Sequence, residues 1–297
     1  MQYQRTVAER IELRGEGIFT GKEILVEIFP AEENTGIVFV RADLKRMPKI
    51  KVGSDTVIGL EGATAVTDGT HIVYLVEHLL SALHAMGIDN AEIRVHGEEI
   101  PIFDGSAYKW VRAIQEVGYK FCFTPKKFFR VKEEFLLKNG KGFIHFKPSN
   151  KLLIKAEIQF DHPLIGHQIF EIEVTPRSYI NEICFARTFG FKEFIQEKIK
   201  QGALKGGSLE NAIILDEKGV LNPDGLRCSD EFVRHKVLDI IGDLYALGIP
   251  FQAEVHAYCS GHRLHIEALK TLYREGLLEE VEAQSLTFVV IPKMALR

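Results

Sequence analysis

The stretch EFVRHKVLDIIGDLYALG (residues 231–248) gives the clearest secondary-structure signal in this 297-residue chain. Its apolar residues recur every three or four positions, which is the period of an amphipathic helix, and Gly248 is a typical helix stop. The inward-facing positions are Val233, Val237, Ile240, Leu244 and Leu247. We therefore predict a helix that ends near Leu247.

The residues around this helix predict further short elements. FQAEVHAYCSGHRLHIEALKTLY (251–273) reads as a strand, a glycine turn and a closing helix, and AIILDEKGVLNP (212–223) as a hairpin. Strands are expected near 128–137, 141–146, 152–160 and 168–174, with a helix near 191–201 and a loop at GALKGGS (202–208). In the tail after residue 274, GLLEEVEAQ (276–284) is typical of a short helix and LTFVVIP (286–292) of an apolar strand.

The N-terminal part repeats this order of elements. Short strands are expected from Thr6 to about Val57, and HIVYLVEHLLSALHAMG (71–87) predicts a helix with an apolar stripe. AEIRVHG (91–97) reads as a strand, and DGSAYKWVRAIQEVG (104–118) as a helix capped by Asp104 or Ser106. We predict an α+β fold of two similar domains, 1–124 and 125–297, each a β-sheet layered against α-helices, with the active site between them.

Composition excludes several classes of protein. Hydrophobic residues make up 46% of the chain, charged residues 26%, and the formal net charge is −4, which excludes a disordered or collagen-like chain and argues against a nucleic-acid partner. Four well-separated cysteines favour neither a disulfide framework nor a thiolate zinc site. Since no signal peptide and no apolar run of about 18 residues is found, we predict a cytoplasmic protein without stable membrane insertion.

Two clusters could hold a metal. His235, Asp239 and Asp243 stand four residues apart on the predicted helix, so they share a face, and imidazole and carboxylate are ordinary ligands of zinc. Taken alone, such a pattern is more often a solvated face. Glu77 and His78 interrupt an otherwise apolar helix, where His78 could bind the ion and Glu77 reach a water beside it; the alternative is a rim glutamate and a core histidine. His84, further along, is expected at the surface.

A general acid could come from HAYCSGHRLH (256–265), because histidine titrates near neutrality. His262 follows a glycine turn and could face a cleft, but spacing alone does not rank it above His256 or His265. An ordinary loop histidine is the alternative for each. The glycine-rich strings GEGIFTG (15–21) and LKGGS (204–208) match no P-loop or dinucleotide fingerprint and are interpreted as turns.

Together, these motifs resemble one family: VEHLLSAL (76–83), EIPIFDGSA (99–107), FARTFGF (185–191), LKGGSLENAI (204–213), LNPDGLRCSDEFVRHKVLDIIGDLYALG (221–248) and AYCSGH (257–262). The chain resembles UDP-3-O-acyl-N-acetylglucosamine deacetylases, the zinc enzymes of lipid A synthesis in Gram-negative bacteria. The resemblance extends to about Tyr273 and leaves the tail, 274–297, unmatched.

The resemblance implies the roles of seven residues at the reacting centre. It implies one zinc ion per chain, with ferrous iron as the alternative, held by His78, His235 and Asp239. Glu77 would be the general base, and His262 would protonate the leaving amine with Asp243 holding its ring. Thr188 would donate a hydrogen bond to the oxyanion. The products implied are acetate and the UDP-linked 3-O-(3-hydroxyacyl)-glucosamine.

The resemblance also implies the substrate contacts. Lys236 would meet the diphosphate, Phe189 the sugar and Phe160 the uracil, while Gly207 and Leu204 would line the sugar pocket. The insert at about 189–214, with Phe194, Ile195 and Ile199 at helical spacing, corresponds to the acyl-chain passage of the family. An amphipathic helix packed on the sheet is the alternative for this insert.

Three residues depart from the family pattern. Phe19 stands where the family usually has histidine, Leu75 where it has threonine, and Cys259 where lysine is frequent. None is an implied ligand, base or acid, so the departures bear on substrate affinity. They motivate two other hypotheses: a nucleotide-sugar-binding relative without turnover, and a metal hydrolase that acts on a different acylated amine. Nothing in the sequence predicts a stable oligomer, so a monomer is expected.

Overall fold

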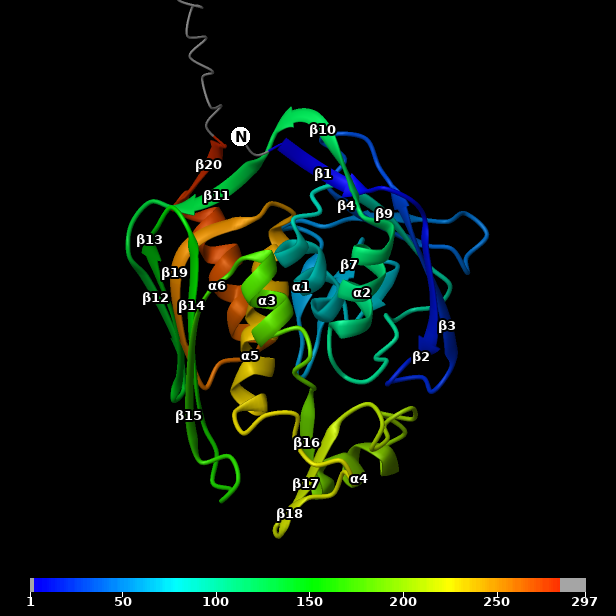
Figure 1. Ribbon diagram of the computed structural model, residues 1–297, viewed down its shortest axis with the longest axis vertical. Coiled ribbons are helices and arrows are strands. Elements are labelled where there is room, and N and C mark those ends of the chain that lie inside the picture. The colour runs from blue at the N-terminus through cyan, green and yellow to red at the C-terminus, as the bar shows by residue number, and fades with distance from the viewer. Residues whose placement is uncertain (1–2, 284–297) are drawn as a thin grey trace, which may run out of the picture.

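The structure is a computed structural model that describes residues 3–283 and has a mixed α+β fold. One group of sheets lies at the right of Figure 1 and another at the left, and most of the helices lie between them. A small unit built from β16 (Phe189–Phe191), α4 (Lys192–Lys200), β17 (Ile213–Asp216) and β18 (Gly219–Val220) projects at the bottom of the same view. No helix in the described part of the chain is long and apolar enough to cross a bilayer.

The N-terminal half builds a five-stranded sheet in the order β2-β3-β9-β4-β5 and a three-stranded sheet β6-β7-β8. Alternation decides which face is buried: in EILVEIFP, Ile24, Val26 and Ile28 point into the core. The elements are β1 (Tyr3–Val7), β2 (Ile11–Glu16), β3 (Glu23–Pro30), β4 (Ile37–Arg41), β5 (Lys49–Lys51), β6 (Val57–Gly59), β7 (Thr64–Thr67), β8 (Ile72–Tyr74), α1 (Glu77–Met86), β9 (Ala91–Val95), α2 (Tyr108–Val117) and β10 (Tyr119–Pro125).

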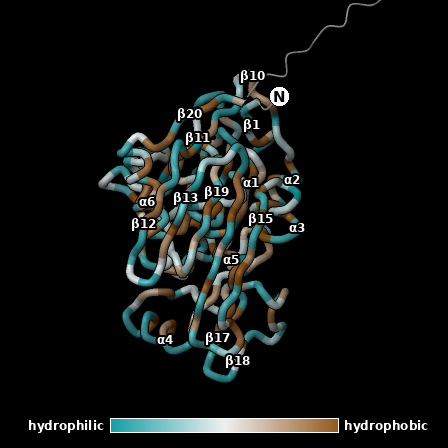
Figure 2. Tube along the Cα trace, turned by 90° about the vertical axis from the view of Figure 1, so that its left-hand side faces the viewer, coloured by the Kyte–Doolittle hydropathy of each residue, from teal (hydrophilic) through white to brown (hydrophobic). Residues whose placement is uncertain are grey.

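The C-terminal half builds a seven-stranded sheet in which β19 pairs with β13, β14 and β11. Figure 2 looks onto this sheet and shows hydrophilic and hydrophobic residues interspersed along its strands. The elements are β11 (Lys127–Val131), β12 (Phe135–Asn139), β13 (Gly142–Pro148), β14 (Leu152–Gln159), β15 (His167–Glu173), α3 (Pro176–Glu182), β16 (Phe189–Phe191), α4 (Lys192–Lys200), β17 (Ile213–Asp216), β18 (Gly219–Val220), α5 (Glu231–Leu244), a 3-10 turn (Tyr245–Leu247), β19 (Phe251–Tyr258), α6 (His262–Arg274) and β20 (Leu278–Glu282).

The predicted domain boundary, between residues 124 and 125, lies close to Lys126, where strand β10 ends and strand β11 begins in a different sheet. β10 pairs with β1, whereas β11 pairs with β19 and β20. A single hydrophobic core nevertheless contains residues from both halves, including Leu79 and Leu238. The limits 1–124 and 125–297 therefore stay a prediction.

Most predicted elements are confirmed, three details are wrong, and one helix was missed. The helix predicted from residue 71 begins at Glu77, because residues 72–74 pair with β7 as strand β8. The cap of α2 is Ala107 without a side-chain cap, although the Ser106 hydroxyl accepts a hydrogen bond from the Tyr108 amide at 3.2 Å. GLLEEVEAQ contains strand β20 instead of a helix, and α3 was not predicted. LTFVVIP (286–292) lies outside the described residues.

Candidate active site

Helices α1 and α5 pack closely enough to bring their polar side chains together. Gly242 makes this approach possible, since a Cβ there would lie 2.1 Å from the carbonyl oxygen of Glu77. One turn further along α1, the Ser81 hydroxyl donates to the Leu238 carbonyl at 2.8 Å and accepts from the Tyr179 hydroxyl at 2.8 Å. These contacts fix α1 against α5 at the level of the predicted ligands.

His78, His235 and Asp239 form a buried cluster between these helices, with each residue at most 5% exposed. The Nε2 atoms of His78 and His235 lie 3.8 and 3.3 Å from Asp239 Oδ1. Zinc bonds of about 2.0–2.1 Å in a tetrahedral site place ligand atoms about 3.4 Å apart. Asp239 Oδ1 is buried and accepts no hydrogen bond from the described residues. An unpartnered buried carboxylate oxygen facing two imidazole nitrogens fits a divalent metal.

The protonation states of the cluster suit metal binding. Burial, helped by the neighbouring His235 ring, lowers the pKa of His78 to about 3, and burial also lowers the pKa of His235. Both imidazoles are therefore neutral, which is the form that binds metal. Although burial favours the protonated acid, the positive charges of Lys236 and His262 hold the pKa of Asp239 well below its usual range.

Glu77 is buried beside the cluster, at the first position of α1. Its Oε2 accepts a hydrogen bond from the Thr64 amide at 2.9 Å. Burial raises its pKa from 4.5 to about 7, with the nearby Asp243 and Asp239 charges acting in the same direction. A carboxylate with this pKa is suited to take up a proton near neutrality.

His262 begins α6 and faces the same cavity. Its Nδ1 lies 2.9 Å from Asp243 Oδ2, and its Nε2 lies 3.9 Å from Asp239 Oδ2. Burial alone would lower the pKa of His262, but these two carboxylates raise it to about 10, while the same pairing lowers the pKa of Asp243 to about 2. The structure thus places a protonated imidazole close enough to the Glu77 carboxyl group for the two to interact.

The other two candidate acids lie elsewhere. His256 is on β19, where its Nε2 contacts Glu157 at 3.2 Å. His265 is buried behind Asp243, with its Nδ1 2.7 Å from Asp243 Oδ2. Neither lines the cavity. The structure therefore favours His262 among the three histidines, which spacing in the sequence did not rank.

A cavity of about 610 Å³ opens over the cluster. Its floor carries Glu77, His78, His235 and Asp239, and one wall carries Thr188 and Phe189. An apolar side is supplied by Phe194, Ile195, Ala203 and Leu204, from the α4 segment and the loop after it. The arrangement can hold a polar reacting group beside an apolar chain.

Comparison with known proteins agrees with this geometry. A family model for UDP-3-O-acyl N-acetylglycosamine deacetylase (LpxC) matches residues 4–274. The UDP-3-O-acyl-N-acetylglucosamine deacetylases of Nautilia profundicola and Pseudomonas entomophila are 42% and 41% identical to the chain over 278 and 274 residues. These alignments cover 94% and 92% of the chain, and 94% and 90% of the relatives. The chain belongs to this deacetylase family. It is therefore a zinc-dependent amidohydrolase of lipid A biosynthesis.

The deacetylase cavity includes some, but not all, of the substrate contacts predicted from the sequence. Phe189, Lys236 and Leu204 line it, and Lys236 Nζ lies 2.9 Å from Asp239 Oδ2. Phe160 does not line the cavity; its ring packs on Phe189 with centroids 5.6 Å apart. Gly207 is also outside the lining, and its amide donates to the Leu204 carbonyl at 3.0 Å.

The three departures from the family pattern all line this cavity. Phe19 packs edge-on against Tyr74 with centroids 6.0 Å apart, and its amide donates to Glu99 Oε2 at 2.9 Å. Leu75 and Cys259 both have positive φ, at 61° and 42°. Each of the three residues therefore borders the cavity, and none of them belongs to the cluster of His78, His235 and Asp239.

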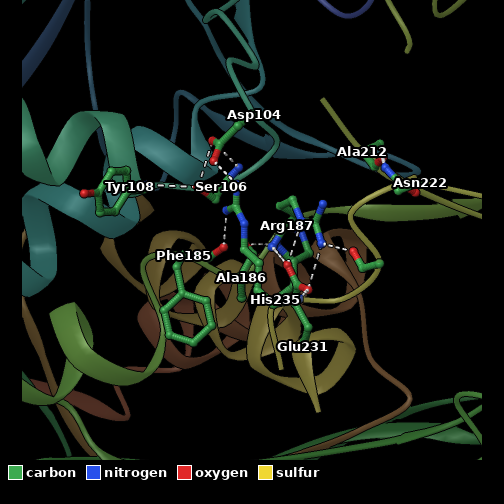
Figure 3. A network of polar contacts seen from close by, with 12 residues as sticks. Asp104, Ser106, Tyr108, Phe185, Ala186, Arg187, Ala212, Asn222, Glu231 and His235 are labelled. Atoms are coloured by element: carbon green, nitrogen blue, oxygen red, sulfur yellow. Dashed lines mark hydrogen bonds and ion pairs between the residues drawn. The ribbon is translucent and has the colours of Figure 1, made fainter. Parts of the chain in front are cut away.

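Sequence reasoning on the deacetylase missed several supporting residues and misplaced one. Thr64 donates its hydroxyl to Asp243 Oδ1 at 2.6 Å, and nothing in its sequence context signals that contact. Glu231 and Arg187 form a buried ion pair at 2.8 Å, shown in Figure 3. The sequence did offer a sign that Glu231 has a buried partner, because this acidic residue lies one turn before His235 on a mostly apolar helix. His84, expected at the surface, is buried, and its Nδ1 lies 3.0 Å from the Ile241 carbonyl oxygen.

Proposed function

We propose that the chain hydrolyses the N-acetyl group of UDP-3-O-(3-hydroxyacyl)-N-acetylglucosamine to acetate and the free amine at this single site. The observation that carries the proposal is the buried Asp239 Oδ1, which has no hydrogen-bond partner among residues 3–283 and faces two neutral imidazoles. A carboxyl group and a protonated imidazole lie on the same cavity. His78, His235 and Asp239 would hold one zinc ion, or ferrous iron. A zinc ion there supplies Lewis acidity, which polarises a carbonyl and acidifies water.

The chain's own residues carry the proton transfers. The Glu77 carboxylate takes a proton from the attacking water, which its raised pKa favours near neutrality. The His262 imidazolium donates a proton to the departing nitrogen, and its contact with Asp243 keeps it charged until then. The Thr188 hydroxyl, on the wall beside the cluster, donates a hydrogen bond to the oxygen where negative charge develops.

The remaining parts of the substrate follow the shape of the cavity. The acyl chain lies along the apolar side formed by the 189–214 insert, where Phe194 is 47% exposed and α4 buries none of its residues. That exposure favours a binding role over an amphipathic helix packed on the sheet. Lys236 and Phe189 bind the diphosphate and the sugar. Leu204 borders the sugar pocket, and Gly207 supports it from outside the cavity through its hydrogen bond to the Leu204 carbonyl. Phe160, packed on Phe189, supports the uracil end.

The finer arrangement of the chain is part of the same proposal. Two similar domains meet at the site, since α1 comes from the first half and α5 and α6 from the second. A monomeric, cytoplasmic protein with one metal per chain and no nucleic-acid partner stays a prediction from the sequence.

Acetate release tests the proposal. Purified protein should release acetate from the UDP-sugar, lose this activity on chelation and regain it with one equivalent of zinc. Glu77→Gln and His262→Gln should bind one metal per chain but turn over at least about 100-fold more slowly. No acetate from zinc-loaded wild-type protein would contradict the substrate assignment.

A matched pair of variants on α1 tests the ligand set. His78→Ala and His84→Ala each remove a buried imidazole from the same helix. Only His78→Ala should lose the metal, measured by metal content after dialysis. Equal metal loss in both variants would mean that folding, and not ligation, controls binding.

A further inference from the structure

A single peptide unit is held at both ends by two residues of α5. The peptide group between Ala186 and Arg187 contributes both contacts. Its carbonyl oxygen, from Ala186, lies 3.1 Å from His235 Nδ1, and its N–H, from Arg187, donates to Glu231 Oε1 at 3.1 Å. Figure 3 shows Ala186, Arg187, Glu231 and His235 together in this network. Because Glu231 and His235 are four residues apart, side chains from consecutive turns of α5 form hydrogen bonds with opposite ends of one peptide group.

The Glu231 carboxylate is held in place by several hydrogen bonds. It is fully buried and also accepts hydrogen bonds from Arg187 Nε at 2.8 Å, Arg187 Nη2 at 3.1 Å and the Arg227 amide at 2.7 Å. Arg187 Nη2 donates in addition to the Gly225 carbonyl at 2.7 Å. Charge-assisted hydrogen bonds of this number leave the peptide little freedom to rotate.

The contact orients the imidazole as well as the backbone. A carbonyl has no proton to give, so Nδ1 of His235 must be the donor, and Nε2 keeps its lone pair. Nε2 is the atom 3.3 Å from Asp239 Oδ1. Hydrogen bonds in a chain polarise one another, so an amide that donates to a carboxylate has a carbonyl that accepts more strongly.

We propose that Glu231 is a positioning residue for His235, acting through the Ala186–Arg187 peptide. The carboxylate of Glu231 polarises the peptide, the peptide carbonyl holds Nδ1–H of His235, and the ring presents a more electron-rich Nε2 to the metal. Metal-binding histidines often donate directly to a carboxylate; here a peptide unit stands between the two. The inference rests on the proposed ligand role of His235.

Zinc affinity is the readout that separates positioning from simple support. Glu231→Gln alone leaves Arg187 as an unpaired buried charge, so the main variant is the double substitution Glu231→Gln/Arg187→Met. It keeps an amide oxygen near the peptide but removes the carboxylate charge. Competition with a chelator should show zinc bound about 10-fold to 100-fold more weakly, and the absorption bands of the cobalt-substituted protein should shift.

A second buried ion pair supplies the control. Asp89 and Lys126 lie 3.0 Å apart, each less than 10% exposed, beyond the C-terminal end of α1 and away from His78. Asp89→Asn/Lys126→Met should change zinc affinity by less than about twofold, whatever its effect on stability. Equal zinc affinity in the two double variants would overturn the proposal.

The unaltered protein provides a test that does not depend on how the variants fold. In the metal-free chain at neutral pH, nitrogen-15 shifts of the His235 ring should report a protonated Nδ1 and an unprotonated Nε2. The opposite tautomer would overturn the proposal. Zinc binding that survives His235→Ala would instead overturn the ligand assignment on which the proposal rests, so the two failures are distinguishable.

Discussion

Replacing Asp243 by Asn should move the basic limb of the pH–rate profile to lower pH. The substitution keeps the shape of the side chain but removes the charge that lies 2.9 Å from His262 Nδ1. Two unit charges about 4 Å apart interact by about 4 kcal/mol at an effective dielectric constant of about 20. Since one pKa unit corresponds to about 1.4 kcal/mol, the pKa of His262 should fall from about 10 by about three units.

The direction follows from the proposed role of His262 as the general acid. The general acid must be protonated, so activity is lost as pH rises through its pKa, and a lower pKa brings that loss to lower pH. At about pH 6 the variant should retain kcat/KM within about threefold of wild type. At about pH 9 only about one molecule in a hundred carries the proton, so kcat/KM should be about 100-fold below wild type.

The assay is acetate release with limiting substrate across this pH range. Thr64→Val is the control, because it removes the hydrogen bond to Asp243 Oδ1 and leaves the charge; its basic limb should move by less than about one pH unit. If Asp243→Asn lowers kcat/KM by the same factor at every pH, Asp243 acts by geometry alone and the electrostatic reasoning is refuted.

Three further predictions use the same measurements. His265→Asn removes a donor from Asp243, which should strengthen the pairing with His262 and move the basic limb to higher pH by up to about one unit; a move to lower pH would contradict this. Burial raises the pKa of Glu77 from 4.5 to about 7, so the folded metal-free chain holds a proton that the unfolded chain has released between these values. Its free energy of unfolding in urea should therefore fall as pH rises from 4.5 to 7, and Glu77→Gln should flatten that slope. Phe194→Ala should lower kcat/KM for the natural acyl chain by about 10-fold and leave a substrate with a truncated chain nearly unaffected, because only the long chain reaches this side of the cavity; an equal effect on both substrates would exclude an acyl-binding role.

The parts of the fold and site predicted correctly depend on local geometry. The period of α5 is set within the segment itself, so the shared face of His235, Asp239 and Asp243 could be predicted from spacing alone. The unusual polar pair at Glu77 and His78 was visible because the rest of that helix is apolar. These signals needed no knowledge of what the helix packs against.

The parts that failed depend on tertiary contacts. His84 was expected at the surface because one helix face usually is, but nine of the ten residues of α1 are buried, and the His84 ring stacks on Tyr245 with centroids 4.8 Å apart. GLLEEVEAQ has a helical composition, yet pairing with β11 from Lys127 to Val131 draws β20 into the sheet. The contacts of Thr64 and His265 with Asp243 join residues that are 179 and 22 positions apart, and one sequence carries no sign of them.

The spacing of α5 also explains how one helix serves several different neighbours. Glu231, His235, Asp239 and Asp243 follow one another at intervals of four residues. A turn holds about 3.6 residues, so each interval advances the side chain by about 40° around the axis, and the whole series by about 120°. The first carboxylate therefore faces the Arg187 segment. The next two side chains face His78 on α1, and the last faces His262 on α6. Because of this slow rotation, the four polar side chains face three different neighbours, while His235 and Asp239 still share one cavity with His262.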